Sequence, residues 1–196
     1  MTFDIVFAGV GGQGVLSLAT ILAEGAQADG LLAKQSEIHG MSQRGGAVSA
    51  SLRLSRQPIH SPLVSHGTAD LLLSLEPLET FRYLALLKPG GRPLSSLNPM
   101  RNIADYPPMD EILRALQALP KVHVLDLDAL AREAGNPRTT NVVMVGAASH
   151  FLPIIPATLE AGIRRRFQVK GERTVAQNLA AFRLGRQALG QPVAID

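Results

Sequence analysis

The sequence predicts an α/β protein, a three-layer domain with a mostly parallel sheet and a helical C-terminus. Three observations predict this class. The chain opens with a short apolar run at residues 5–8, a glycine-rich turn and then a helical pattern. A continuous apolar run at residues 70–75 is typical of a central strand that is buried on both faces. Two amphipathic helical patterns close the chain, at residues 157–167 and from residue 172 to about residue 189.

The glycine-rich turn has the sequence Gly-Val-Gly-Gly-Gln-Gly and follows the first predicted strand. The segment after it carries apolar residues at helical spacing, including Leu18, Ile21 and Leu22. Glycines accept positive φ angles and let an anion approach the free N–H groups at a helix N-terminus. We therefore expect a phosphate or carboxylate site here, with Gln13 adding an uncharged donor. Its glycines are Gly9, Gly11, Gly12 and Gly14.

The same turn matches the G-x-G-x-x-G fingerprint of a dinucleotide site. That fingerprint also requires an acidic residue about 20 positions later, for the ribose. Lys34 lies near that distance and Glu37 comes later. A free-standing NAD(P)-binding, Rossmann-like oxidoreductase is therefore an alternative. A second alternative is that the glycines serve only a tight turn and close helix packing.

The composition excludes several classes of protein. The 196 residues, 46% hydrophobic and 18% charged, are typical of an ordinary globular chain. Aromatic residues make up 4% with no Trp, and the net charge is +3, so nothing favours a nucleic-acid platform. The chain contains no Cys, which excludes disulfides and thiolate ligands for iron–sulfur clusters. No apolar run reaches the ~20 residues of a membrane span, and we expect a cytoplasmic protein.

The rest of the chain reads as a single domain over residues 1–196. Strands are predicted at 31–38 and 47–54, which form a hairpin-like pair, and at 92–97 and 122–125. Lys88 to Gly91 is predicted as a turn and residues 98–108 as a loop. Helices are predicted from Pro77 to about residue 87, and at 109–119, 128–134 and 142–152. Thr140 or Asn141 is the expected cap of the last of these.

Three segments together resemble a known family. They are the turn at residues 9–15, the sequence Ser-Glu-Ile-His-Gly-Met-Ser-Gln-Arg-Gly-Gly at residues 36–46, and an Asn before an apolar helix with Gly-Ala at residues 141–147. The chain resembles the gamma-type subunit of 2-oxoacid:ferredoxin oxidoreductases over residues 3–185. Within that family it looks most like the beta (small) subunit of indolepyruvate ferredoxin oxidoreductase. The domain assignment that follows is a pyruvate/ketoisovalerate oxidoreductase gamma-type domain, with C-terminal helices at about 157–189.

The resemblance implies an accessory subunit that is not expected to be active alone. The implied complex oxidatively decarboxylates indolepyruvate or another arylpyruvate, transfers the acyl group to coenzyme A and passes electrons to ferredoxin. Thiamine diphosphate, Mg²⁺ and iron–sulfur clusters are expected on the large partner subunit, and coenzyme A is expected to contact this chain. An exposed apolar patch is expected for the partner. No nucleic acid or membrane partner is expected.

The resemblance also selects further candidate site residues, which are Ser36, Glu37, His39, Arg44, Gly45 and Asn141. A guanidinium at Arg44 suits a phosphate or a carboxylate, and an acidic patch on the partner suits it equally. His39 either relays a proton or, the better interpretation, orders its loop. Asn141 is either a ligand-binding residue or, more often at such a position, a helix cap.

Overall fold

The computed structural model describes residues 2–39 and 45–189, apart from the side chain of His39. Its elements in chain order are β1 (Phe3–Val10), α1 (Val15–Ala28), β2 (Leu32–His39), β3 (Ala47–Ser55), β4 (Ala69–Ser74), α2 (Pro77–Tyr83), η1 (Leu84–Leu86), β5 (Leu87–Ser96), α3 (Met109–Gln117), β6 (His123–Leu125), α4 (Leu127–Glu133), η2 (Pro137–Thr139), α5 (Thr140–Ala148), α6 (Pro156–Phe167), η3 (Gln168–Lys170) and α7 (Glu172–Ala188). None of the helices in this part of the chain is long and apolar enough to cross a membrane.

The sheet has six strands in the order β2-β3-β1-β4-β5-β6. Strands β1, β4, β5 and β6 are parallel neighbours, whereas β3 pairs antiparallel with both β1 and β2. The α/β class and the hairpin-like pair of strands are confirmed. The predicted parallel pairing holds for β1, β4, β5 and β6, and the β2–β3 hairpin makes the sheet as a whole mixed.

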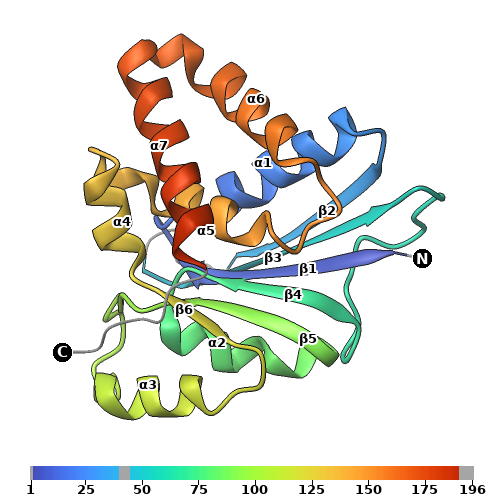
Figure 1. Cartoon of the computed structure of the whole chain (residues 1–196). Helices are drawn as coiled ribbons and strands as arrows, with labels where there is room; N and C mark the ends of the chain where they lie inside the picture. Colours follow the sequence, from blue (N-terminus) through green and yellow to red (C-terminus); the bar gives the residue numbers. More distant parts are fainter. Residues whose placement is uncertain (1, 40–44, 190–196) are drawn as a thin grey trace.

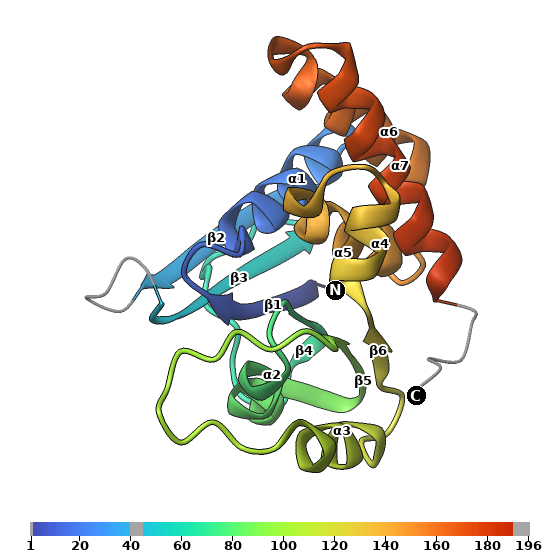
Figure 2. The ribbon, with the colours of Figure 1, turned by 90° about the vertical axis from the view of Figure 1, so that its left-hand side faces the viewer.

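The sheet is the middle of three layers (Figure 1). Helices α1, α5, α6 and α7 lie on one face, and α2 and α3 lie on the other. The hairpin of β2 and β3 projects beyond α2, so α1 covers one of its faces and no helix in the described chain covers the other (Figure 2). The main core lies between the sheet and the α1–α5–α7 layer, where Phe7, Leu18, Leu22 and Phe182 are fully buried.

The first βα unit forms as the sequence predicts. Seven of the eight residues of β1 are buried, because β3 and β4 flank the strand and helices cover both of its faces. The chain then turns at Gly14, whose φ of 87° belongs to the left-handed region that glycine tolerates. Leu18, Ile21 and Leu22 of α1 all point into the core, as their helical spacing requires.

Helices α5 and α7 pack against each other at two glycines. A Cβ atom at Gly146 would lie 2.0 Å from the backbone oxygen of Phe182, and one at Gly185 would lie 2.0 Å from that of Val143. The two backbones are therefore in direct contact, which only a residue without a side chain allows. This contact fixes the position of α5, whose N-terminus belongs to the candidate site.

Three sequence predictions need correction. The segment predicted as a turn at Lys88 to Gly91 belongs to β5, because Leu87 already pairs with Ala69 and the irregularity is absorbed as a register shift between Ala69 and Leu71. Helix α2 ends at Tyr83, and the 3₁₀ turn η1 replaces its predicted last turn.

The third correction concerns the start of α5. Neither Thr140 nor Asn141 caps this helix: the N-cap residue is Thr139, which makes no side-chain capping bond. The turn η2 leads into the helix instead, and the Asn136 side chain caps that turn by accepting a hydrogen bond from the Arg138 N–H at 3.0 Å.

The glycine contact predicts opposite effects of two similar substitutions. Gly185→Ala places a methyl group against the Val143 carbonyl and should lower the free energy of unfolding by about 3 kcal/mol. Gly162→Ala, in α6, meets no atom within 4 Å and should raise it by about 0.5–1 kcal/mol through helix propensity. Urea denaturation of both variants checks this, and equal effects would contradict the contact.

Candidate functional site

The candidate site lies at the edge of the sheet where β1, β4 and β5 end. Because β3 is antiparallel, its first residue, Ala47, stands opposite the last residue of β1, Val10. The glycine turn after β1 and the residues before β3 therefore reach the same edge. In open α/β sheets, ligands bind outside the carboxyl ends of the strands, at the point where the chain changes direction across the sheet. Figure 2 looks onto this edge.

The structure brings two of the predicted segments together through their backbones. The N–H of Gly11 donates to the oxygen of Gly46 at 2.9 Å, and the N–H of Gly45 donates to the oxygen of Gly11 at 3.5 Å. The predicted site residue Gly45 thus lies against the glycine turn. Arg44, the next residue toward the tip, lies outside the described residues, as does the side chain of His39.

The glycines of the turn have different tasks. A Cβ at Gly9 would lie 2.8 Å from Val15 and 2.9 Å from the Gln13 side chain, so Gly9 is needed for close packing. Gly12 and Gly14 have φ angles of 108° and 87°, which other residues rarely adopt. A Cβ at Gly12 would have no neighbour within 4 Å, so the backbone there is open to a ligand.

Gln13 is used within the fold. Its Oε1 accepts a hydrogen bond from the Val10 N–H at 2.7 Å, and its Nε2 donates to the Leu75 oxygen at 3.0 Å. The side chain therefore ties the end of β1 to the end of β4. This contact is a structural one that sequence analysis missed, and the role of Gln13 as a donor to a ligand stays a prediction.

Two helix N-termini meet at Gly14. A Cβ on this residue would lie 3.0 Å from Nδ2 of Asn141, in the first turn of α5. In the part of the chain that the structure describes, neither α1 nor α5 has a side-chain cap. Both helices therefore begin close to Gly14, and the positive end of a helix dipole favours an anion there.

Asn141 adds a donor to this place. The residue is 8% exposed, and its Oδ1 accepts a hydrogen bond from the Val142 N–H at 3.0 Å, which orients the carboxamide. Its Nδ2, on the side toward Gly14, has no hydrogen-bond partner among residues 2–39 and 45–189. This Nδ2 is not among the fully buried atoms that lack a partner, so it reaches the surface and can donate to a ligand oxygen.

An open pocket of about 260 Å³ lies beside the turn. Its lining carries no charged side chain and consists of Val10, Gly11, Gly12, Gly14, Val15, Leu16 and Val48. Backbone N–H groups and apolar surface together suit a phosphate attached to a long neutral chain better than a small, highly charged ion.

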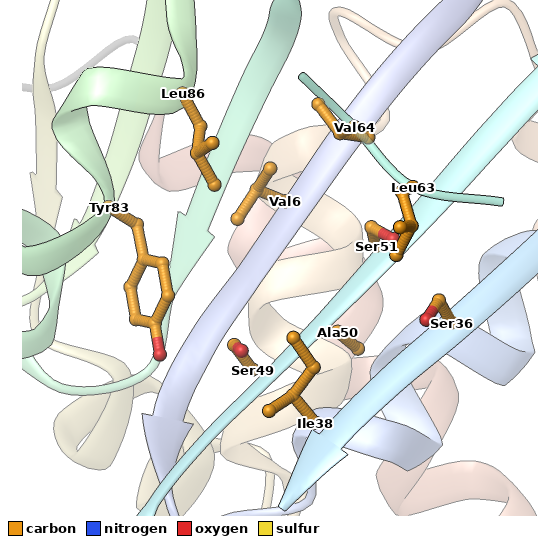
Figure 3. A pocket seen from close by; sticks show the side chains of 10 residues that line it. All are labelled: Val6, Ser36, Ile38, Ser49, Ala50, Ser51, Leu63, Val64, Tyr83 and Leu86. Carbon is orange, nitrogen blue, oxygen red and sulfur yellow. The ribbon is translucent and has the colours of Figure 1, made fainter. Parts of the chain in front are cut away.

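Ser36 and Glu37 lie on opposite faces of β2. Glu37 pairs in register with Ala50, on the face that α1 covers, and its Oε1 accepts a hydrogen bond from Gln35 at 2.8 Å. Ser36 lies on the other face and lines a separate pocket (Figure 3). Because β3 stands between β2 and β1, the structure does not bring Ser36 to the glycine turn.

That separate pocket exposes apolar side chains, and its role as the expected patch for the partner stays a prediction. Its lining combines the uncovered face of β2 and β3 with Val6, with the segment of Leu63 and Val64, and with Tyr83 and Leu86. Figure 3 shows Leu63 beside Ser51 and Ile38 beside Ser49. Ile38 is 64% exposed and Leu63 is 58% exposed. We call the surface of Ser36, Ile38, Ser49, Ser51 and Leu63 the hairpin face.

Sequence analysis missed a buried carboxylate at the same edge. Glu76 follows β4 and is 1% exposed, and its Oε2 accepts a hydrogen bond from the Glu79 N–H at 2.8 Å, capping α2. Its Oε1 accepts a hydrogen bond from the Tyr106 hydroxyl. Burial and this carboxylate raise the pKa of Tyr106 well above its usual value, so the phenol stays protonated and keeps donating. The Glu-Pro pair at a strand end is the sequence signal that marks this position.

Glu79 and His123 also have shifted pKa values, and both contact other residues of the fold. Burial raises the pKa of Glu79, although its ion pair with Arg82 at 3.0 Å opposes this. His123 in β6 stacks on Phe151 with ring centroids 5.4 Å apart, and burial, with Arg92 nearby, lowers its pKa. No group of three or more His, Asp or Glu residues in the described chain is arranged to hold a metal ion.

Comparison with known proteins identifies the family. The model of the family described as pyruvate ferredoxin/flavodoxin oxidoreductase matches residues 4–188. The chain belongs to this family. It is 37% identical over 196 residues to indolepyruvate oxidoreductase subunit IorB of Thermococcus kodakarensis, an alignment that covers 95% of each chain.

Solved structures agree on the fold. The gamma subunit of a keto/oxoacid ferredoxin oxidoreductase from Geobacter sulfurreducens has a TM-score of 0.71 and 26% identity, covering 95% of this chain and 98% of that one. The 2-oxoglutarate:ferredoxin oxidoreductase from Magnetococcus marinus, solved with 2-oxoglutarate, coenzyme A and succinyl-CoA, has a TM-score of 0.77 and 24% identity. That match covers all of this chain and 32% of the longer one.

The strand order weakens the dehydrogenase alternative. In a dinucleotide fold, β2 lies beside β1 and places its acidic residue next to the glycine turn. Here β3 occupies that position, and it runs antiparallel. The family and the topology therefore favour an oxidoreductase subunit over a free-standing NAD(P) enzyme.

Proposed function

We propose that this chain is the accessory small subunit of a thiamine diphosphate-dependent 2-oxoacid:ferredoxin oxidoreductase. The complex would act on indolepyruvate or another arylpyruvate, release CO₂, transfer the acyl group to coenzyme A and pass the electrons to ferredoxin. Family membership and full-length similarity to an indolepyruvate oxidoreductase subunit support this proposal. Thiamine diphosphate, Mg²⁺ and the iron–sulfur clusters would be held by a large partner subunit, and the complex would work in the cytoplasm.

The share of this chain would be to bind coenzyme A at the carboxyl edge of the sheet. The observation that carries this is the meeting of the N-termini of α1 and α5 at Gly14, with the unpaired Asn141 amide beside them. A pyrophosphate placed there would accept hydrogen bonds from backbone N–H groups and from Asn141. The apolar wall of Val10, Val15 and Val48 suits the neutral pantetheine arm.

The other candidate residues would complete this site from the β2–β3 loop. Arg44 would add a guanidinium for a phosphate or for the 2-oxoacid carboxylate, and His39 would order the loop. The Gly11–Gly46 backbone bond supports this arrangement, because it holds the base of the loop on the glycine turn. Ser36 and Glu37 lie on the two faces of β2, so they would support the hairpin that carries the loop and would not contact the pyrophosphate.

Reconstitution tests the function. The chain is co-expressed with the thiamine- and cluster-bearing large subunit of the same organism, and arylpyruvate-dependent, coenzyme A-dependent dye reduction is measured with and without it. The proposal predicts co-purification and activity that requires both chains. A stable chain that does not bind the large subunit but binds NAD(P) would overturn the proposal in favour of the dehydrogenase alternative.

Asn141→Asp tests the coenzyme A site. The carboxylate keeps the shape and the acceptor for the Val142 N–H, but it replaces a donor with a negative charge. We expect the KM for coenzyme A to rise about tenfold, the factor given by ~1.4 kcal/mol of lost affinity, with the KM for the 2-oxoacid unchanged. Gln27→Glu, which adds the same charge at an exposed position near the other end of α1, is the matched control. An unchanged KM for coenzyme A in Asn141→Asp would contradict this site.

Ile38→Glu tests the large subunit as the occupant of the hairpin face, which adjoins the β2–β3 loop of the site. Ile38 is 64% exposed in the single chain, so a charge there should leave folding intact but weaken co-purification with the large subunit by about tenfold or more. Val169→Glu, at an 84% exposed position in η3, is the control. Equal retention of both variants in a pull-down titration would show that the large subunit does not cover this face.

A further inference from the structure

A set of hydrogen bonds, here called the brace, holds a further loop next to the glycine turn and the β2–β3 loop. Residues 97–108 connect β5 to α3 and run around α2 at the edge that Figure 2 faces. The loop is exposed along its middle, where Met100 is 38% and Ile103 is 49% exposed. Packing alone therefore does little to fix its path, and specific hydrogen bonds must do so.

Glu76 makes the first of these bonds. One carboxylate oxygen caps α2, and the other accepts hydrogen bonds from the Tyr106 hydroxyl and, at 3.4 Å, from the Met100 N–H. A single buried carboxylate thus joins the start of a helix to two points of the loop. Hydrogen bonds to an ionised acceptor are among the stronger ones in proteins.

Asn102 makes the second contact, at the middle of the loop. Its Nδ2 donates to the oxygen of Gly45 at 2.8 Å. Gly45 and its neighbour Gly46 are the residues that pair with Gly11 of the glycine turn. Hydrogen bonds therefore connect Glu76 to the loop, the loop to Gly45, and Gly45 to the glycine turn at which the anion would bind.

We propose that the loop at residues 97–108 positions the coenzyme A site through its bond to Gly45, and that Glu76, Tyr106 and Asn102 are the positioning residues. This inference rests on the proposed function, because it assigns the loop to the same ligand. Tyr106 and Asn102 touch no reacting atom: Tyr106 fixes the loop on Glu76, and Asn102 fixes Gly45 and the glycine turn against the loop.

Hydrogen exchange of the full-length chain tests the brace. Tyr106→Phe removes only the hydroxyl, and Asn102→Ala removes only the donor to Gly45. Loss of one such bond should speed amide exchange in residues 100–106 and at residues 45–46 by about tenfold. Gln117→Ala, which removes a carboxamide at an exposed position of α3, should leave the exchange unchanged. Exchange that stays at the wild-type rate in both loop variants would overturn the brace.

Kinetics of the reconstituted complex test whether the loop positions the coenzyme A site. The same two variants should raise the KM for coenzyme A at least threefold while kcat at saturating coenzyme A and the KM for the 2-oxoacid stay unchanged. A general loss of folding would lower kcat and the melting temperature instead. Faster loop exchange with an unchanged KM for coenzyme A would overturn this positioning role and leave the proposed function standing. A wild-type complex without coenzyme A-dependent turnover would instead overturn the proposed function itself.

Discussion

The site depends on one antiparallel strand next to β1. Because β3 runs against β1, its beginning lies at the end of β1, and the backbones of Gly11 and Gly46 meet there. In an all-parallel sheet the neighbour of β1 would end at this edge, and the chain would leave it through a crossover. The β2–β3 hairpin instead brings Gly45 and Gly46 into hydrogen-bonding contact with Gly11 of the glycine turn. Everything proposed for the loops at residues 45–46 and 97–108 follows from this contact.

The core and the site are connected through α5. The contacts of Gly146 with Phe182 and of Gly185 with Val143 bring α5 and α7 to backbone distance. A helix that is fixed so closely has little freedom to move its N-terminus, so Asn141 is held against Gly14. The binding geometry at the sheet edge is therefore set by packing that involves no ligand, as a preorganised site requires.

Much of the fold could be predicted from local patterns. The first strand, the turn at Gly14 and the periodicity of α1 are local signals, and the structure confirms them. The hairpin of β2 and β3 followed from two alternating segments around a polar loop. The insertion of β3 between β2 and β1 could not be predicted, because strand order depends on contacts between segments far apart in the sequence.

The site was less predictable for the same reason. The pairing of Gly11 with Gly46 agrees with the choice of both segments. The bonds of Gln13 to Val10 and Leu75, which tie two strands together, have no local signal in the sequence. Glu76 and Tyr106 are 30 residues apart, and no local spacing joins them. Buried polar side chains find partners wherever the fold brings one, so single-sequence patterns reveal the residue types and not the pairs.

The most direct measurement of the central claim is amide exchange in the two-subunit complex, with and without saturating coenzyme A. The account predicts that coenzyme A slows exchange at two separate segments together, the first turn of α1 around Val15 and Leu16 and the first turn of α5 around Asn141 and Val142. Coenzyme A that saturates turnover but protects neither segment would contradict the claim that the two helix N-termini form its pyrophosphate site.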